Sequence, residues 1–148
     1  MTAPEIYEVY AIRYATRQGQ RRDHFVGGDP HDAAMPMDYF VWLLRNKNRT
    51  IVVDTGFHAS MATKRKREYL RSPKEGLALL GVDASTVQDV IITHMHYDHV
   101  GTFDDFPQAR FHLQDAEMRF ATGRHMCNDY MSHPYEVDEV VSMVRLVY

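Results

Sequence analysis

The spacing of apolar residues predicts strands in the first third of the chain. An aromatic and β-branched stretch from Ile6 to Tyr14 favours an early strand, and a polar loop with several glycines and prolines follows over residues 18–36. The segments "DYFVWLL" and "TIVVDTG", separated by the turn-forming "RNKNR", predict two further strands. Ile51, Val52 and Val53 are consecutive apolar residues, so we expect this last strand to be covered on both faces.

The remaining two thirds alternate between helical and strand patterns. Residues 59–80 look mainly helical, with a break at Ser72-Pro73 and a stop at Gly81. The segment "DASTVQDVIITH" predicts a short helix followed by a buried strand, Val90–Thr93. A third short strand is expected in "ARFHLQ", and a helix in "DAEMRFATG". Near the end of the chain, valines recur at helical spacing: Val137, Val140, Val141, Val144 and Val147. This order predicts an α/β fold with a mixed sheet packed with helices. The chain stops at "MVRLVY" within an apolar pattern and without a cap, so we expect a cut inside a domain.

Composition excludes several classes of protein. With 148 residues, of which 45% are hydrophobic and 25% charged, the chain can form one globular domain with a core. The net charge of -3 gives no general attraction to nucleic acid or anionic membrane. The sequence contains no apolar run of membrane-spanning length and no secretory signal, so we expect a cytoplasmic protein. Cys127 has no second cysteine to pair with, and we expect a buried thiol.

The candidate chemistry lies in "THMHYDHVGTF", which contains His94, His96, Asp98 and His99. Side chains at i and i+2 of an extended segment point to the same side, so His94 and His96 can converge on one ion. The stretch directly follows a predicted buried strand, where ligand sites of α/β sheets gather. Imidazole and carboxylate donors suit zinc, or iron, manganese or cobalt. A histidine-rich surface loop is the plain alternative, and the spacing favours the metal site.

These motifs resemble a known family. The H-x-H-x-D-H pattern and the upstream "IVVDTG" are similar to the metallo-β-lactamase superfamily, and "PMDYFVWLLRN" and "HMHYDHVGTF" look most like its N-acyl homoserine lactonase branch. The resemblance implies an αβ/βα sandwich of two similar halves around two divalent metal ions, zinc above all. It implies that His94 and His96 bind the first ion, that Asp98 and His99 bind the second, and that Asp54 supports the site without coordinating.

The resemblance covers only part of a family member. The family completes both metal shells with a further His, a bridging Asp and a last His downstream, and none has a match here. His112, His125 and His133 follow the motif too soon. We therefore expect residues 1–148 to be the N-terminal portion of a single metallo-β-lactamase-fold domain. The expected partner is the missing C-terminal half of the same enzyme, and a homodimer stays open.

The implied activity is metal-assisted hydrolysis. The ions lower the pKa of a bound water to about 7, and the resulting hydroxide attacks the carbonyl carbon of a lactone like an N-acyl homoserine lactone, or of a related ester. Asp98 is the candidate catalytic residue, since it can also steer the attacking water. The lactonase branch implies quorum quenching. A thioester hydrolase resembling the hydroxyacylglutathione hydrolases is the alternative enzyme, and a non-catalytic incomplete domain acting as an assembly partner is the alternative class.

Weaker signals have plain structural interpretations. The loop over residues 18–36 is either a lid over an acyl substrate or an ordinary surface loop. The basic run from Lys64 to Glu68 is interpreted as a solvated helix face. Phe40 and Trp42 alternate within a predicted strand, and we expect them in the core.

Overall fold

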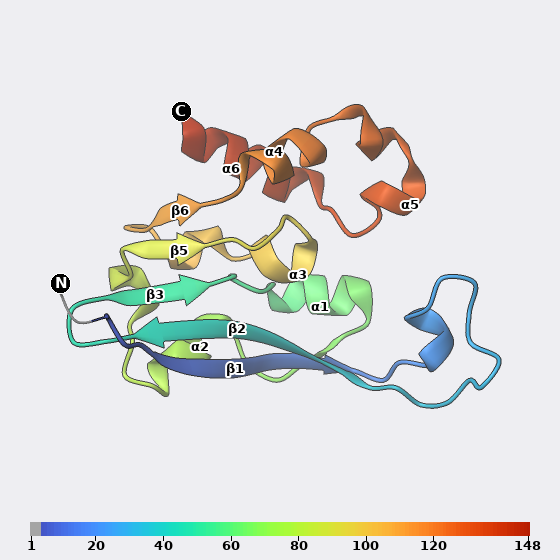
Figure 1. The fold of residues 1–148 in the computed structure, drawn as a ribbon, viewed down its shortest axis with the longest axis horizontal. Helices are drawn as coiled ribbons and strands as arrows, with labels where there is room; N and C mark the ends of the chain where they lie inside the picture. Colours follow the sequence, from blue (N-terminus) through green and yellow to red (C-terminus); the bar gives the residue numbers. More distant parts are fainter. Residues whose placement is uncertain (1–3) are drawn as a thin grey trace.

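The computed structural model describes residues 4–148, and a mixed six-stranded sheet organises them (Figure 1). The strands are β1 (Glu8–Arg17), β2 (Met37–Arg45), β3 (Thr50–Val53), β4 (Glu68–Tyr69), β5 (Asp89–Ile91) and β6 (Arg110–His112), in the order β4-β1-β2-β3-β5-β6. The pairs β4–β1, β1–β2 and β2–β3 are antiparallel, whereas β3–β5 and β5–β6 are parallel. The expected mixed α/β fold is confirmed, and the parallel part places the ends of β3 and β5 side by side.

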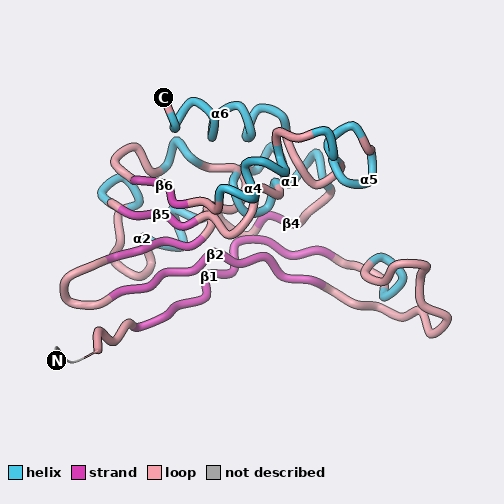
Figure 2. Tube along the Cα trace, turned by 45° about the horizontal axis from the view of Figure 1, so that its top comes forward, coloured by secondary structure: helices cyan, strands magenta, loops and turns pink. Residues whose placement is uncertain are grey.

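Six α-helices connect and flank the strands: α1 (Ala59–Arg65), α2 (Pro73–Ala78), α3 (Tyr97–Val100), α4 (Asp115–Ala121), α5 (Asp129–Ser132) and α6 (Val137–Val147) among the described residues. Short 3-10 turns lie at η1 (Arg21–Asp23), η2 (Ala84–Thr86), η3 (Phe103–Asp105) and η4 (Arg124–Cys127). Helix α2 begins where the sequence break was expected, because Ser72 caps it reciprocally with Glu75. Figure 2 shows α4, α5 and α6 beyond the β6 edge of the sheet.

The core lies on one face of the sheet. Tyr14, Val41, Leu43, Val52 and Val90 are fully buried there, in one cluster with residues of α1, α2 and α3. Helix α2 packs closely on β1, since a Cβ at Gly76 would clash with the Cγ2 atom of Ile12. The helices therefore cover this face of the sheet, and the opposite face has no helix of this cluster packed on it.

The second face of the sheet is largely open. Cross-strand register aligns Ala11, Trp42, Val53, Ile91 and His112 in one row across five strands. Trp42 is 41% exposed and Ile91 is 37% exposed. An apolar row across a sheet is usual where a second layer packs against it.

This open face corrects two expectations from the sequence. Phe40 and Trp42 were expected in the core and are exposed, because alternation along β2 turns both away from the helices. The strand at Ile51–Val53 was expected to be covered on both faces. Val52 is buried, whereas Ile51 and Val53 are only partly buried on the open face.

Three further details differ from the sequence expectations. Strand β1 begins at Glu8, so Ile6 precedes it and is exposed. The stretch expected to be mainly helical, residues 59–80, contains the short strand β4, which adds to β1 between α1 and α2. Cys127 is exposed rather than buried, because it ends the turn η4 at the surface. Within residues 4–148 no helix is long and apolar enough to cross a membrane.

The β1–β2 connection forms a projecting arm over residues 18–36 (Figure 1). Its own ion pairs hold it together, with Arg21 on Asp29 at 2.8 Å and Arg22 on Asp32 at 3.2 Å. An isolated bridge between Gln20 and Ala34 closes its base. Backbone hydrogen bonds from Arg21 N to Ala33 O at 2.9 Å and from Met35 N to Gly19 O at 2.8 Å make the arm an extension of the hairpin.

Candidate metal centre

Two loops that follow adjacent parallel strands meet at one end of the sheet. The first, Asp54 to Gly56, follows β3, and the second, beginning at Thr93, follows β5. Backbone hydrogen bonds join them: Asp54 N donates to Ile91 O at 2.8 Å, Thr55 N to His99 O at 2.7 Å, and Gly101 N to Gly56 O at 2.7 Å. The "DTG" turn is therefore the support on which the histidine-rich loop rests.

Two glycines make this close contact sterically feasible. Gly56 has a φ of 70°, in the left-handed region, and a Cβ there would come within 2.8 Å of Pro73 and 3.0 Å of Tyr14. Gly101 has an ordinary φ, but a Cβ there would lie 2.8 Å from the Gly56 carbonyl oxygen. A side chain at Gly101 would push the two loops apart, and one at Gly56 would displace the turn from Tyr14 and Pro73.

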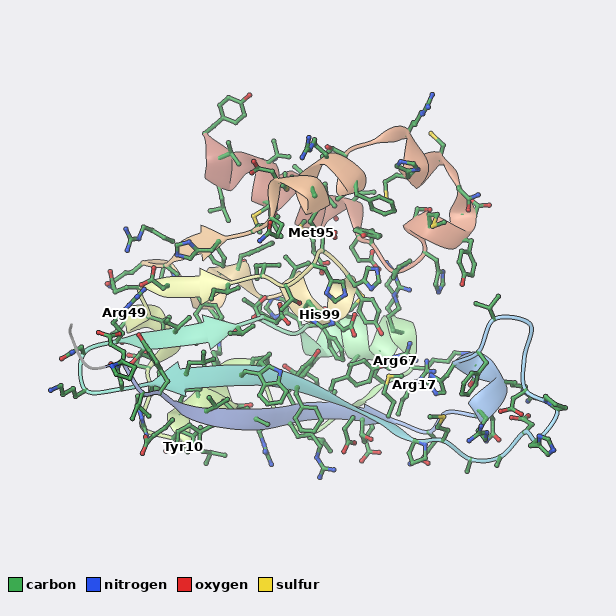
Figure 3. The ribbon with its side chains drawn as sticks, in the orientation of Figure 1. Tyr10, Arg17, Arg49, Arg67, Met95 and His99 are labelled. Carbon is green, nitrogen blue, oxygen red and sulfur yellow. The ribbon has the colours of Figure 1, made fainter. Side chains whose placement is uncertain are left out.

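The structure brings the four candidate donors together. The ring centroids of His94 and His96 lie 4.4 Å apart, and those of His94 and His99 lie 3.9 Å apart. His99 Nε2 lies 3.6 Å from Asp98 Oδ2. All four side chains are partly buried and start from the β5 end or the first turn of α3. Figure 3 shows His99 near α3 and Met95 on the side of α4.

Asp54 fixes the orientation of two of the histidines. Its carboxylate, 4% exposed, accepts hydrogen bonds from the Thr93 N–H at 2.8 Å and the Thr93 hydroxyl at 2.9 Å. His99 Nδ1 lies 2.7 Å from the Asp54 Oδ2 atom, so that nitrogen carries the proton and donates it to the carboxylate. The lone pair of His99 is consequently on Nε2, the atom that faces Asp98.

The same network determines the tautomer of His94. The one proton of the Thr93 hydroxyl goes to Asp54, because a carboxylate is the stronger acceptor. His94 Nδ1, 3.0 Å from this hydroxyl oxygen, must then donate to it. His94 therefore also presents its Nε2 lone pair, as a metal-ligating imidazole does when its other nitrogen is hydrogen-bonded to the protein.

The pKa shifts of the three histidines differ in direction. Burial lowers the pKa of His94, and the neighbouring His99 lowers it further. Burial likewise lowers the pKa of His96, with His94 adding to the effect. For His99, burial lowers the pKa, but the hydrogen bond to Asp54 and the charge of Asp98 outweigh it and raise it overall. His94 and His96 are thus held neutral, which a metal ligand requires.

The separation of two of the donors suits binding to one divalent metal ion. Two donors bound to one tetrahedral ion at about 2.1 Å lie about 3.4 Å from each other, close to the separation of His99 Nε2 and Asp98 Oδ2. Across residues 4–148, no three His, Cys, Asp or Glu side chains are arranged to hold a metal ion together. The described residues therefore match part of the ligand set of a metal site and not a complete set.

The other histidines considered lie in different environments. His112 pairs in register with Ile91 of β5, and its Nε2 atom lies 2.9 Å from Asp89 Oδ1, away from the motif. His125 stacks on Phe120, and His133 contacts Arg65. The structure therefore does not bring any of the three into the candidate centre.

Sequence reasoning missed several residues that hold the centre in place. Thr93 links Asp54 to His94, and its only sequence signal was its position directly before the first histidine. The Tyr14 hydroxyl donates to the Asp98 carbonyl oxygen at 2.7 Å. Glu117 accepts a hydrogen bond from the Met95 N–H at 2.8 Å. Neither Tyr14 nor Glu117 is near the motif in sequence, so no local pattern could have found them.

Comparison with known sequences assigns the family. The sequence profile of the Metallo-beta-lactamase superfamily matches residues 35–122, more than half of the chain. The chain belongs to the metallo-β-lactamase superfamily. Probable metallo-hydrolases of Mycobacterium bovis and Mycobacterium tuberculosis are each 43% identical to it over 42 residues, which is 28% of this chain and 14% of theirs. The matched segment is therefore a small part of those proteins.

Solved structures of metallo-β-lactamase hydrolases share the fold. A quorum-quenching N-acyl homoserine lactone lactonase is similar with a TM-score of 0.65 and 17% identity, over 90% of this chain and 52% of its own. An N-acyl homoserine lactone hydrolase with N-hexanoyl-L-homoserine at its catalytic metal centre has a TM-score of 0.64 at 16% identity, and the match covers 90% of this chain and 55% of that chain. A probable metal-dependent hydrolase from Staphylococcus aureus has a TM-score of 0.68 at 13% identity, with the same coverage of 90% of this chain and 55% of that chain. This chain thus spans about half the length of these structures.

Proposed function

We propose that this chain carries the metal-binding motif of a metal-dependent hydrolase that opens lactones of the N-acyl homoserine lactone class or related esters. The observation that carries the proposal is the network around Asp54, which leaves Nε2 of His94 and His99 as free lone pairs at the end of β5. The fold similarity to lactone hydrolases supports the substrate class.

Each donor pair has its own assignment. His94 and His96 would hold one divalent ion, and Asp98 and His99 a second, with zinc as the metal that the donor set suits. Bound divalent ions supply Lewis acidity and activate water near neutral pH. Asp54 stays off the ions and orients His99.

Asp98 is the residue we assign to the reaction itself. Its side chain is 21% exposed, and the Tyr14 hydroxyl anchors its backbone carbonyl. One carboxylate oxygen would hold the ion, and the other could accept a hydrogen bond from water placed beside His99 and orient that water toward the carbonyl carbon of the substrate. Tyr14 itself is no proton donor in this scheme, since burial, with the charge of Asp98 adding to it, raises its pKa far above neutrality.

The open face supports a proposal on the domain organisation. We infer that residues 1–148 form the N-terminal portion of a single metallo-β-lactamase-fold domain, and that the other half packs on the row containing Trp42, Val53 and Ile91. The similar structures have about as much chain again as this one spans. The same layer would bring the remaining metal ligands. A homodimer through this face is the competing arrangement, and the mass in solution compared with the mass of the denatured chain distinguishes the two, because only a homodimer has twice the mass of its chain.

The test combines metal uptake with turnover. The product of the complete gene is loaded with Zn²⁺ and assayed for proton release from N-hexanoyl homoserine lactone and for thiol release from a glutathione thioester. We expect lactone opening that disappears in the His96→Ala and Asp98→Asn variants, and an unchanged rate in Asp38→Asn, which alters an exposed carboxylate that pairs with Arg13. Thioester cleavage without lactone opening would replace the substrate class, and a protein that takes up no metal would overturn the proposal.

A further inference from the structure

Glu117 reaches from helix α4 into the loop that carries the histidines. It lies in the first turn of α4 and is partly buried. Its Oε1 atom accepts two hydrogen bonds, from the Met95 backbone N–H at 2.8 Å and from the Tyr135 hydroxyl at 3.0 Å. One carboxylate oxygen thus joins three segments that are far apart in the sequence.

The backbone conformation of Met95 determines the directions of the His94 and His96 side chains. Met95 lies between His94 and His96, so its φ and ψ angles set the angle between their side chains. Its own side chain is fully buried, which fixes the residue from the core side. The hydrogen bond to Glu117 fixes the backbone N–H of the same residue, and Figure 3 shows Met95 on the side of α4, the helix that carries Glu117.

Tyr135 extends the contact to the second histidine. Its ring meets the His96 ring edge to face, with centroids 4.9 Å apart and an interplanar angle of 86°. Because the Tyr135 hydroxyl donates to Glu117, the carboxylate also sets where this ring lies. His96 has no hydrogen bond to Asp54 or Thr93 among the described residues, so the Tyr135 contact takes the place of that support.

We propose that Glu117 is a positioning residue that holds the His94–His96 pair in its ligating arrangement through the Met95 N–H and the Tyr135 ring. Asp54 and Thr93 then orient His94 and His99, while Glu117 and Tyr135 orient His96 and the backbone between the first two histidines. The two supports approach from opposite sides, one from the β3 turn and one from α4. The role in metal binding rests on the proposed function, whereas the role in fixing the loop does not.

Three variants and one matched control test this role. Glu117→Ala removes the acceptor, Glu117→Gln keeps a carbonyl oxygen at the same place, and Tyr135→Phe keeps the ring but removes the donor. Asp115→Ala is the control, since Asp115 is an exposed acid in the same first turn and contributes the same helix-dipole term.

The first readout needs no metal. In Glu117→Ala we expect the Met95 amide to exchange with solvent at least tenfold faster, with Val52 and Val90 amides unchanged, and the imidazole resonances of His94 and His96 to shift. Glu117→Gln should restore most of the protection, and Asp115→Ala should leave it intact. An unchanged Met95 amide in Glu117→Ala, or equal acceleration of all three amides, would overturn the proposal, because the second result indicates a general loss of stability.

The second readout is the binding of Co²⁺, which is measured from the visible absorption of the bound ion. Loss of such an outer contact weakens metal binding by 10–100-fold, so we expect a drop in this range for Glu117→Ala, a smaller drop for Tyr135→Phe, and none for Asp115→Ala. If the wild-type protein binds no Co²⁺ while the Met95 amide responds as expected, the proposed function fails and the positioning role is supported. If the wild type binds Co²⁺ and Glu117→Ala binds it equally well, the positioning role fails and the proposed function is unaffected.

Discussion

The carboxylate of Asp54 offers the sharpest test of how the centre is held. Replacing it by Asn keeps the shape and tolerates the left-handed backbone, since Asp54 has a φ of 62° and Asn adopts this region readily. The amide offers one acceptor where the carboxylate offers two. Oδ1 accepts from the Thr93 N–H and Oδ2 from His99 Nδ1, so one of these donors loses its partner.

The cost depends on which donor is left unpaired. An unsatisfied, partly buried donor costs about 1–3 kcal/mol, and we expect the free energy of unfolding of Asp54→Asn to fall by that amount. His99 can avoid the loss by moving its proton to Nε2 and accepting from the new amide at Nδ1. That tautomer removes the lone pair that faces Asp98, so metal affinity should fall by 10–100-fold even where stability is largely kept.

Three measurements on one variant separate these outcomes. Urea denaturation of the metal-free protein gives the stability, the nitrogen resonances of His99 give the tautomer, and a Co²⁺ titration gives the affinity. Asp38→Asn is the control, because this carboxylate is exposed and pairs only with Arg13 and Thr16, so its change should stay below about 1 kcal/mol. An Asp54→Asn protein with wild-type stability, a free His99 Nε2 and undiminished Co²⁺ affinity would refute the reasoning.

Three further predictions concern other parts of the molecule. Burial, and then the charge of Glu136, raises the pKa of Glu139 to about 8, so the folded chain holds a proton that the unfolded chain releases near its ordinary value of 4.5. The free energy of unfolding should therefore decrease as the pH rises through this window and level off above it, and urea denaturation at several pH values should show a shallower decrease in Glu139→Gln. In the isolated 148-residue chain, Trp42→Ser should reduce self-association in sedimentation velocity by at least severalfold and change stability by less than about 1 kcal/mol, because the side chain is 41% exposed on the open face; a large loss of stability of this chain would contradict that placement. The 148-residue chain purified alone should bind at most one metal ion, weakly, and hydrolyse no lactone, since four ligands do not fill two metal shells; robust turnover without a second polypeptide would contradict this.

The elements that the sequence predicted best are those with a strong local pattern. Alternation marked β1 and β2, the apolar run marked β3, and Ser72-Pro73 marked the start of α2. The elements that were missed are short and depend on distant contacts. Strand β4 has only two residues and exists because β1 offers a free edge, which no pattern within residues 59–80 could indicate.

The candidate site shows the same division. Spacing alone predicted that His94, His96, Asp98 and His99 would lie together, because each is a few residues from the next at a strand end. The supports that orient them are separated from the motif by as many as 84 residues, as for Tyr14 and Asp98. Such contacts arise only when the sheet places β1 and α4 beside the loop, so they have no signature in local spacing.

The sequence by itself determined the strand-rich first half, the close spacing of His94, His96, Asp98 and His99 in one short loop, and the resemblance to a family. Composition and periodicity suffice for these because they depend on neighbours along the chain. Only the tertiary structure decided which face of the sheet is covered, where Phe40 and Trp42 lie, and which nitrogen of His94 and His99 is free. Those properties depend on pairings across strands and on hydrogen bonds between loops, as between Asp54, Thr93 and His99, and they exist only once the chain has folded.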